Sequence, residues 1–387
     1  MKASAFVYPW DVNGDPEAPG RIAALGVRQV TLAAAYHSTR ALTPRHPRHR
    51  IVTAEHAAVL YPSDDRWKGR ELRPYPAGDW APGDAFGEAA AALADAGLEV
   101  HTWVVLAHNS RLGAEHPATS VVNAYGDRYP WAPCIAQPAT RAYLVDLAAE
   151  AAVRPGARGT ELESLGWYGL QHLHAHDKTA GVPLGDAGHY LMALCFCPTC
   201  TEGYGAQGLD AEELAAAVRA ALEPLWQGAP DDGGWPGVEK LLGSRTAKAT
   251  RAWRDEIART LQETAVRAVR AAAPDGFQIL LHADPVTHHV GANPGVDPEH
   301  ILSLADGVVV PCAGGPGLLT PFAEPGRDGA VVAANLGVVS GMGGSPGTLA
   351  SDAARARAFG ATEIRLYHAG LASDGDLAAV REGLAAL

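Results

Sequence analysis

Three cysteines within six positions, Cys195, Cys197 and Cys200, form the pattern in this chain that is best suited to binding a metal ion. Only five cysteines occur in the 387 residues, so chance clustering of small buried thiols is the less favoured explanation. Thiolates bind Zn²⁺ in tetrahedral sites, and three of them need one more ligand. Cys134 is the candidate for it, which leaves Cys312 unligated. We expect a structural zinc site, since four thiolates leave no position for substrate.

Two carboxylates are expected on one strand. Glu161 and Glu163 alternate along the otherwise apolar run 161–167, so their side chains would share one face. Carboxylates inside a barrel are costly unless they are paired or used. The sequence therefore makes Glu161 and Glu163 candidate catalytic carboxylates. For Glu161 the alternative is a solvated residue at the strand edge.

A second carboxyl group would complete the chemistry of a glycosidase. Such enzymes commonly hold two carboxyl groups, about 5 Å apart when they retain the anomeric configuration and about 6.5 to 9.5 Å apart when they invert it. The candidates are Asp284, Glu161, Asp177 and Asp11. Asp284 ranks first because it ends another predicted strand that faces the same mouth. Retention and inversion both stay open.

The elements that would position these groups alternate between strands and helices. Runs rich in β-branched and aliphatic residues predict eight strands, at 4–9, 29–34, 99–106, 161–167, 278–284, 307–311, 330–336 and 363–368. Ala-rich amphipathic stretches predict helices at 84–96, 138–152, 210–225, 246–272, 298–304, 351–359 and 376–386. No glycine-rich phosphate turn follows an early strand, as a doubly wound sheet would favour. We expect an α/β fold, a single (β/α)8 TIM barrel over residues 1–387.

Two predicted connections are far longer than the usual two to six residues, about 36–82 and the insertion 168–275 between the fourth and fifth strands. The insertion carries the cysteine cluster, so we expect it to be helical and fastened by zinc to the segment at Cys134. In such barrels the loops after the strands build the active site.

Polar and aromatic residues stand at the ends of six predicted strands, as carbohydrate binding requires. Each alone could be a buried, hydrogen-bonded histidine or a core aromatic. Trp103 is a further stacking candidate. The expected substrate-binding residues are Trp10, Asp11, His37, His108, Asn109, Trp167, His172, His282, Tyr367 and His368. Alternating histidines at 172, 174 and 176, or His282 with Asp284, could instead bind a catalytic cation.

The composition limits the partners. A net charge of -12 and a pI near 5.7 argue against nucleic acid and membrane surfaces. No stretch has the roughly 20 apolar residues of a membrane span, and no signal peptide opens the sequence, so we expect a cytoplasmic protein. A homo-oligomer stays open. The segment 40–50 has four arginines and two histidines, which suits an anionic or polyhydroxylated ligand or a solvated loop.

The order of these motifs resembles a known family. Cys134-Ile135-Ala136-Gln137-Pro138 with Arg141 opening a helix, then a strand-end glutamate, then CxCxxC, is similar to the barrel domain of family 42 β-galactosidases and related clan A glycoside hydrolases. The resemblance covers roughly 84–225. It implies zinc ligation by the four cysteines and an acid/base role for Glu163.

This sequence also departs from the family pattern. The family's acid/base glutamate follows an asparagine, whereas Leu162 stands here, and its nucleophilic glutamate lies on the seventh strand, where 330–336 has no carboxylate. We expect a divergent, barrel-only glycoside hydrolase that cleaves a small or unusual sugar conjugate or an oligosaccharide. The alternatives are a metal-dependent hydrolase and a carbohydrate-binding barrel without activity.

Overall fold

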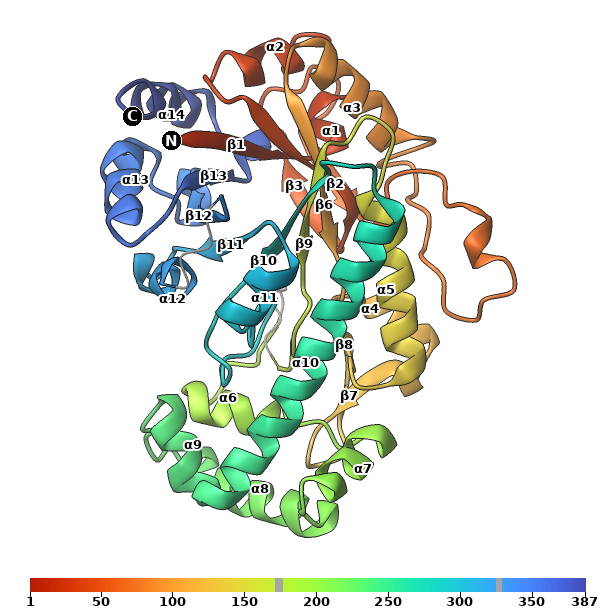
Figure 1. Ribbon diagram of the computed structural model, residues 1–387, viewed down its shortest axis with the longest axis vertical. Coiled ribbons are helices and arrows are strands. Elements are labelled where there is room, and N and C mark those ends of the chain that lie inside the picture. The colour runs from red at the N-terminus through yellow and green to blue at the C-terminus, as the bar shows by residue number, and fades with distance from the viewer. Residues whose placement is uncertain (171–176, 325–328) are drawn as a thin grey trace.

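Eight parallel strands close into a barrel in the computed structural model, which describes residues 1–170, 177–324 and 329–387 (Figure 1). The strands pair in the order β1-β13-β12-β11-β10-β9-β6-β2, and pairing of β1 with β2 closes the ring. The predicted TIM barrel is confirmed. The strands are β1 (Lys2–Val7), β2 (Gln29–Tyr36), β6 (Glu99–Val105), β9 (Gly159–Glu163), β10 (Gln278–His282), β11 (Gly307–Pro311), β12 (Val331–Gly337) and β13 (Glu363–Tyr367).

Several strands end one to four residues earlier than the sequence predicts, β9 and β1 among them. β9 stops at Glu163 because Ser164 has a φ of 62°, in the left-handed region that breaks the extended conformation. β1 stops at Val7 because Pro9 begins the short helix α1 (Pro9–Val12). The early stop of β9 leaves Glu163 as its last residue, at the carboxyl end of the barrel.

Helices cover the outside of the barrel, and their buried faces are mainly alanine and leucine. Some of these helices begin with a side-chain cap. Asp84 accepts from the backbone N–H of Gly87 at the start of α3, and Ser373 accepts from that of Asp376 at the start of α14. The helices outside the insertion are α2 (Ala18–Ala23), α3 (Ala85–Asp95), α4 (Ser110–Glu115), α5 (Pro138–Ala152), α11 (Pro298–Leu304), α12 (Thr320–Ala323), α13 (Leu349–Ala358) and α14 (Asp374–Ala385).

The first long connection contains a hairpin of β3 (Thr39–Leu42) and β4 (Ile51–Ala54), followed by β5 (Ala58–Val59), which pairs antiparallel with β2. The basic segment 40–50 is therefore partly hairpin. Its Arg45 donates to the backbone oxygens of Gly370 and Ala372, so it fastens the hairpin to the segment after β13. A second small sheet, β7 (Ser120–Val122) with β8 (Arg128–Pro133), follows β6.

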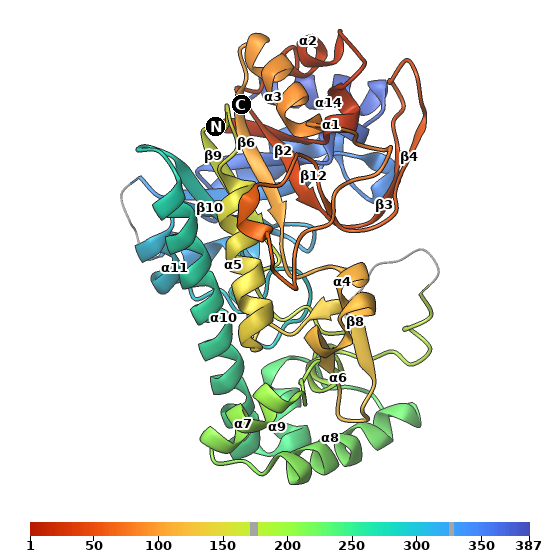
Figure 2. The ribbon, with the colours of Figure 1, turned by 90° about the vertical axis from the view of Figure 1, so that its right-hand side faces the viewer.

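The connection between β9 and β10 is largely helical, as predicted. Figures 1 and 2 show its helices gathered at one end of the molecule, with α10 running back beside α5. These helices are α6 (Asp186–Met192), α7 (Pro198–Ala206), α8 (Ala211–Trp226), α9 (Gly234–Leu242) and α10 (Ser244–Ala272). α10 buries Trp253, Ile257, Leu261 and Ala265 at helical spacing. No described helix is long and apolar enough to cross a membrane.

Candidate active site

Glu163 lies at the carboxyl end of β9, where the barrel opens. Its Oε2 accepts a hydrogen bond of 2.6 Å from the indole Nε1 of Trp103 on β6, and Nδ1 of His282 stands 3.8 Å from the same oxygen. The residue is 8% exposed, so it is largely shielded from water but reaches the surface of the mouth. This is the place where barrel enzymes hold catalytic side chains.

Glu161 lies one layer deeper in the barrel and is fully buried. Arg365 donates from Nε to its Oε1 at 2.6 Å, and the Thr31 hydroxyl donates to the same oxygen at 3.2 Å. Burial alone would raise the pKa of Glu161, but the charge of Arg365 and the neighbouring His282 outweigh it and bring the pKa to about 2. Glu161 is therefore an ionised partner in a buried ion pair, and not a solvated edge residue.

His282 stands between the two glutamates. Its Nε2 lies 3.7 Å from Oε2 of Glu161, while its Nδ1 faces Glu163. Both distances are longer than a hydrogen bond, so the imidazole separates the carboxylates without a strong bond to either one. The edge of Phe6 packs against this ring at 5.7 Å between ring centres.

Aromatic rings surround Glu163. Trp103 is at the centre of them, and its neighbours meet it mostly edge-on or tilted, the arrangement that ring quadrupoles favour. The centroids of these neighbours lie 4.6 to 5.8 Å away, and the rings belong to Phe6, Tyr8, Tyr36, Tyr367 and His368.

A chain of hydrogen bonds crosses this cluster. The Tyr8 hydroxyl donates to that of Tyr36 at 3.0 Å and lies 2.9 Å from Nδ1 of His368. Which of the two atoms donates in this second contact depends on the tautomer of His368. Burial, assisted by nearby His37, lowers the pKa of His368 to about 3, which keeps the ring neutral.

A second group of stacked rings continues along the mouth. His37 stacks on Tyr36 at 4.2 Å, His108 lies 4.8 Å from His37, and Tyr168 stacks on His108 at 4.3 Å. Burial and the charge of Glu163 raise the pKa of Tyr168, as they do that of Tyr36, so both phenols stay protonated. The site thus combines one carboxyl group with hydroxyl and imidazole donors over flat apolar surfaces.

Most of the predicted substrate-binding residues meet here. Trp10 joins by stacking on Tyr8 at 4.6 Å. The sequence places Tyr8 and Tyr36 at strand ends that face the mouth, but they were not chosen as binding residues, and Tyr168 was missed. The members that were predicted are Trp10, His37, His108, His282, Tyr367 and His368.

Other predicted residues lie elsewhere. Asn109 caps α4, where its Oδ1 accepts from the backbone N–H of Leu112 at 2.9 Å. Trp167 packs against α10 and donates to the backbone oxygen of Arg254 at 3.0 Å. The chain turns at Ser164, directly after β9. Because of this turn, the Trp167 side chain lies in the hydrophobic core beneath α10. His172 lies outside the described residues, as do His174 and His176.

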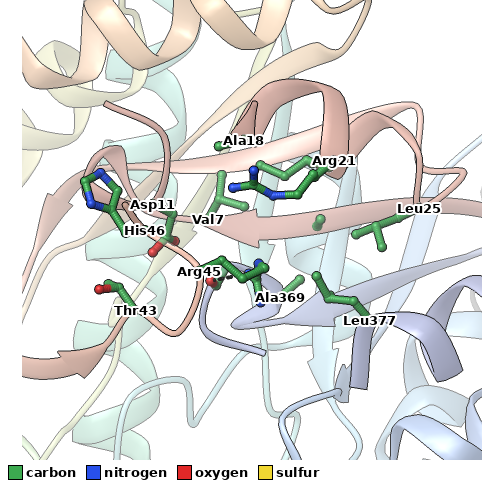
Figure 3. A pocket seen from close by; sticks show the side chains of 13 residues that line it. Val7, Asp11, Ala18, Arg21, Leu25, Thr43, Arg45, His46, Ala369 and Leu377 are labelled. Carbon is green, nitrogen blue, oxygen red and sulfur yellow. Dashed lines mark hydrogen bonds between the residues drawn. The ribbon is translucent and has the colours of Figure 1, made fainter. Parts of the chain in front are cut away.

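Asp11 faces the outer side of β1. Its Oδ2 accepts from the backbone N–H of Tyr8 at 2.8 Å, and Figure 3 shows it beside Arg45 and Val7 in a pocket. Val7 and Phe6 point to opposite sides of the strand, and Phe6 is the one inside the barrel. Burial raises the pKa of Asp11 to about 7, against the opposing effects of the Tyr8 N–H and Arg45. This carboxyl group belongs to the outer pocket.

Asp284 follows β10 and is engaged within its own loop. Its Oδ1 accepts from the backbone N–H of Val286 at 2.8 Å, and its Oδ2 lies 2.7 Å from Nδ1 of His289. That hydrogen bond is the main reason why the pKa of His289 is raised. The two form an ion pair when His289 is protonated.

The four cysteines converge in a buried cluster. The sulfur of Cys134 lies 3.7 Å from that of Cys195, 3.6 Å from that of Cys197 and 3.7 Å from that of Cys200. Four sulfurs at about 2.3 Å from one tetrahedral ion would stand about 3.8 Å apart, so the cluster could bind a metal ion. Cys312 lies apart after β11, where burial raises its pKa to about 11.

Comparisons with known proteins bear on the fold. No protein-family profile and no curated protein sequence matches the chain. Among solved structures, α-L-fucosidase isoenzyme 2 from Paenibacillus thiaminolyticus aligns with a TM-score of 0.57 and 13% identity, over 99% of this chain and 48% of that one. The PgaB (BpsB) glycoside hydrolase domain from Bordetella bronchiseptica aligns with a TM-score of 0.53 and 16% identity, over 99% and 98%.

A catalytic mutant of Gan42B, a GH42 β-galactosidase from G. stearothermophilus, aligns with a TM-score of 0.54 and 13% identity, over 100% of this chain and 56% of that one. The chain thus spans about half the length of the fucosidase and the galactosidase, and nearly all of the Bordetella domain. At these low identities the likeness concerns the fold. The chain is a divergent barrel that is similar to those of glycoside hydrolases, GH42 β-galactosidases among them.

Proposed function

We propose that this protein is an enzyme that cleaves a glycosidic bond, with Glu163 as the general acid. The observation that carries the proposal is the position of Glu163, which ends the fourth of eight barrel strands inside a ring of aromatic and imidazole side chains. The fold similarity to glycoside hydrolases supports it.

Glu163 is better placed than Glu161 to give up a proton. Trp103 and His282 both face its Oε2, which leaves Oε1 to protonate the oxygen of the leaving group. Glu161 is fully buried and has a pKa of about 2, so it is ionised and out of reach of a ligand. Its role is to position His282 and Arg365 below the site.

The rings of the mouth would bind the sugar. The ring of Tyr367, which is half-buried, suits the C–H face of a pyranose, and Tyr36 can donate to a sugar hydroxyl. His37 and His108 extend the same wall toward a second sugar unit. A sugar conjugate or a short oligosaccharide is therefore the proposed substrate class.

The second carboxyl group is the open part of this chemistry. β12, the seventh strand, carries Asn335 and no carboxylate. The other two predicted catalytic carboxylates are paired with basic side chains, Glu161 with Arg365 and Asp284 with His289. We propose positioning roles for both. One carboxyl group is enough when a neighbouring group of the substrate attacks the anomeric carbon, as in substrate-assisted glycosidases.

A panel of aryl glycosides tests the proposal. Turnover of sugars that carry a 2-acetamido group, with loss of turnover in Glu163→Gln, is the expected result. Equal turnover of sugars with a 2-hydroxyl group would contradict substrate assistance while leaving Glu163 as the acid. Unchanged turnover in Glu163→Gln would contradict the role of Glu163.

The second candidate is a barrel that binds carbohydrate without hydrolysing it. It is favoured by the engagement of Glu161 and Asp284 in ion pairs. Under this alternative no glycoside of the panel is turned over, while binding of a sugar still changes the tryptophan fluorescence, because Trp103 contacts Glu163.

We also propose that the cysteine cluster holds a structural Zn²⁺. Cys134 follows β8, whereas Cys195 precedes α7, Cys197 is its N-cap and Cys200 lies in its first turn. An ion bound to all four would fasten the helical insertion to the segment before α5, with no coordination position left for substrate. Metal analysis should find one zinc per chain that is lost in Cys197→Ser.

A further inference from the structure

We infer a second metal site, formed by Asp186, His288 and His289 and distinct from the cysteine cluster. One ligand atom from each of these residues lies within 4.8 Å of the others. His288 and His289 belong to the loop between β10 and α11, whereas Asp186 is the first residue of α6 in the insertion. Three potential ligands from two distant parts of the sequence therefore meet at one point.

The spacing is close to what a bound ion requires. Nitrogen and oxygen ligands lie about 2.0 to 2.2 Å from a Zn²⁺ ion, so two of them in a tetrahedral site stand about 3.4 Å apart. Asp186 is exposed and both histidines are half-buried. Binding of an ion would therefore draw the three ligand atoms closer together.

Asp284 orients the imidazole of His289 for metal binding. The contact of 2.7 Å between Oδ2 of Asp284 and Nδ1 of His289 fixes the ring and leaves Nε2 as the free nitrogen. A carboxylate that holds a histidine ligand in this way is the usual outer partner of a metal-binding imidazole. Arg254 also donates to the backbone oxygen of His289 at 3.3 Å, which anchors the loop to α10. This arrangement explains the position of Asp284 better than a role as a nucleophile does.

The ligand types select the ion. Two imidazoles and one carboxylate suit borderline divalent transition metals such as Zn²⁺, Co²⁺ and Ni²⁺, whereas Ca²⁺ and Mg²⁺ prefer oxygen ligands. Three protein ligands leave coordination positions open, and the exposure of Asp186 lets solvent or a small ligand reach them. The bound ion would also join the insertion to the barrel loop, near Trp235 of α9, whose ring centre lies 6.3 Å from that of His288.

Titration with Co²⁺ tests the site on metal-free protein that has first received one equivalent of Zn²⁺ per chain, which the four-thiolate cluster takes up. Calorimetry should show one additional Co²⁺ bound per chain. The visible absorption of this Co²⁺ should be weak, as expected for nitrogen and oxygen ligands. The double variant His288→Ala/His289→Ala should lose this binding, and Asp284→Asn should weaken it about 10- to 100-fold. Circular dichroism shows whether each variant is folded.

His116→Ala is the matched control, because His116 also stands near a carboxylate, that of Glu71 at 3.8 Å, but lies outside the cluster. It should bind Co²⁺ like the wild type. Absence of additional Co²⁺ in the wild type, or unchanged binding in the folded double variant, would overturn the inference. Intense thiolate-to-cobalt absorption would do so as well, since it would place the ion in the cysteine cluster.

Discussion

The indole of Trp103 donates to Glu163 across neighbouring strands, with 2.6 Å between Nε1 and Oε2. A hydrogen bond to a charged group contributes about 1.5 to 3 kcal/mol, and the proposed acid Glu163 becomes charged as it gives up its proton. It also fixes which carboxylate oxygen is turned toward the barrel wall and which one is left for a ligand. The proposed chemistry depends on this contact.

Trp103→Phe should therefore slow the enzyme while the barrel stays folded. If loss of this hydrogen bond raises the activation free energy by about 1.5 to 3 kcal/mol, kcat/KM falls by about 10- to 100-fold. Steady-state kinetics on the best aryl glycoside of the panel measures the change. Trp226→Phe is the control, since Trp226 donates to Tyr125 on the exposed side of α8 and should leave kcat/KM unchanged. Equal losses in the two variants would contradict a specific role for Trp103.

Arg365→Met should destabilise the barrel strongly. It leaves the fully buried Glu161 without its charged partner, which costs about 3 to 5 kcal/mol in comparable buried pairs. The double variant Glu161→Gln/Arg365→Met should recover part of this loss. Urea unfolding measures both. Arg267→Met, which breaks an exposed pair with Glu263, should cost less than about 1 kcal/mol.

Asp11→Asn should change how stability depends on pH. The pKa of Asp11 is raised to about 7 in the folded protein, so folding favours its protonated form, and its contribution is lost as the pH rises from about 4 through 7. Asparagine can still accept from the Tyr8 N–H but does not ionise. The variant should gain stability relative to the wild type between pH 5 and pH 8. Melting temperatures of the variant and the wild type measured over this pH range test this. A constant difference between the two proteins would contradict the raised pKa of Asp11.

Cys197→Ser should remove the proposed zinc and loosen the insertion. If free Zn²⁺ exceeds its dissociation constant about 100-fold, its loss costs about 3 kcal/mol of folding free energy. Metal analysis and urea unfolding measure the two effects. Cys312→Ser should keep both the zinc and the stability, because Cys312 lies outside the cluster. A zinc content that is unchanged in Cys197→Ser would exclude this site.

The barrel was predictable because its signal is local. Runs of β-branched residues such as those of β11 and helical patterns such as that of α5 lie where the sequence indicates. The end of β9 was not predictable, since it depends on the left-handed conformation of Ser164, a residue type with no such preference.

The site was predictable only in part. Strand alternation placed Glu161 and Glu163 on one face, but nothing local shows that Arg365, from the last strand, neutralises one of them. Asp284 likewise pairs with His289 through the fold of its own loop. Contacts between distant segments decide which carboxylate stays available, and such contacts carry no signal in a single sequence.

The most direct test of the central claim compares Glu163→Gln with the wild type on substrates that differ in their leaving group. General acid catalysis contributes about 10²- to 10⁴-fold, so the variant should lose at least about 100-fold with a poor leaving group such as an alkyl alcohol. It should lose little with dinitrophenolate, which departs without a proton. An equal loss on both substrates, or none on either, would contradict the assignment of Glu163 as the proton donor.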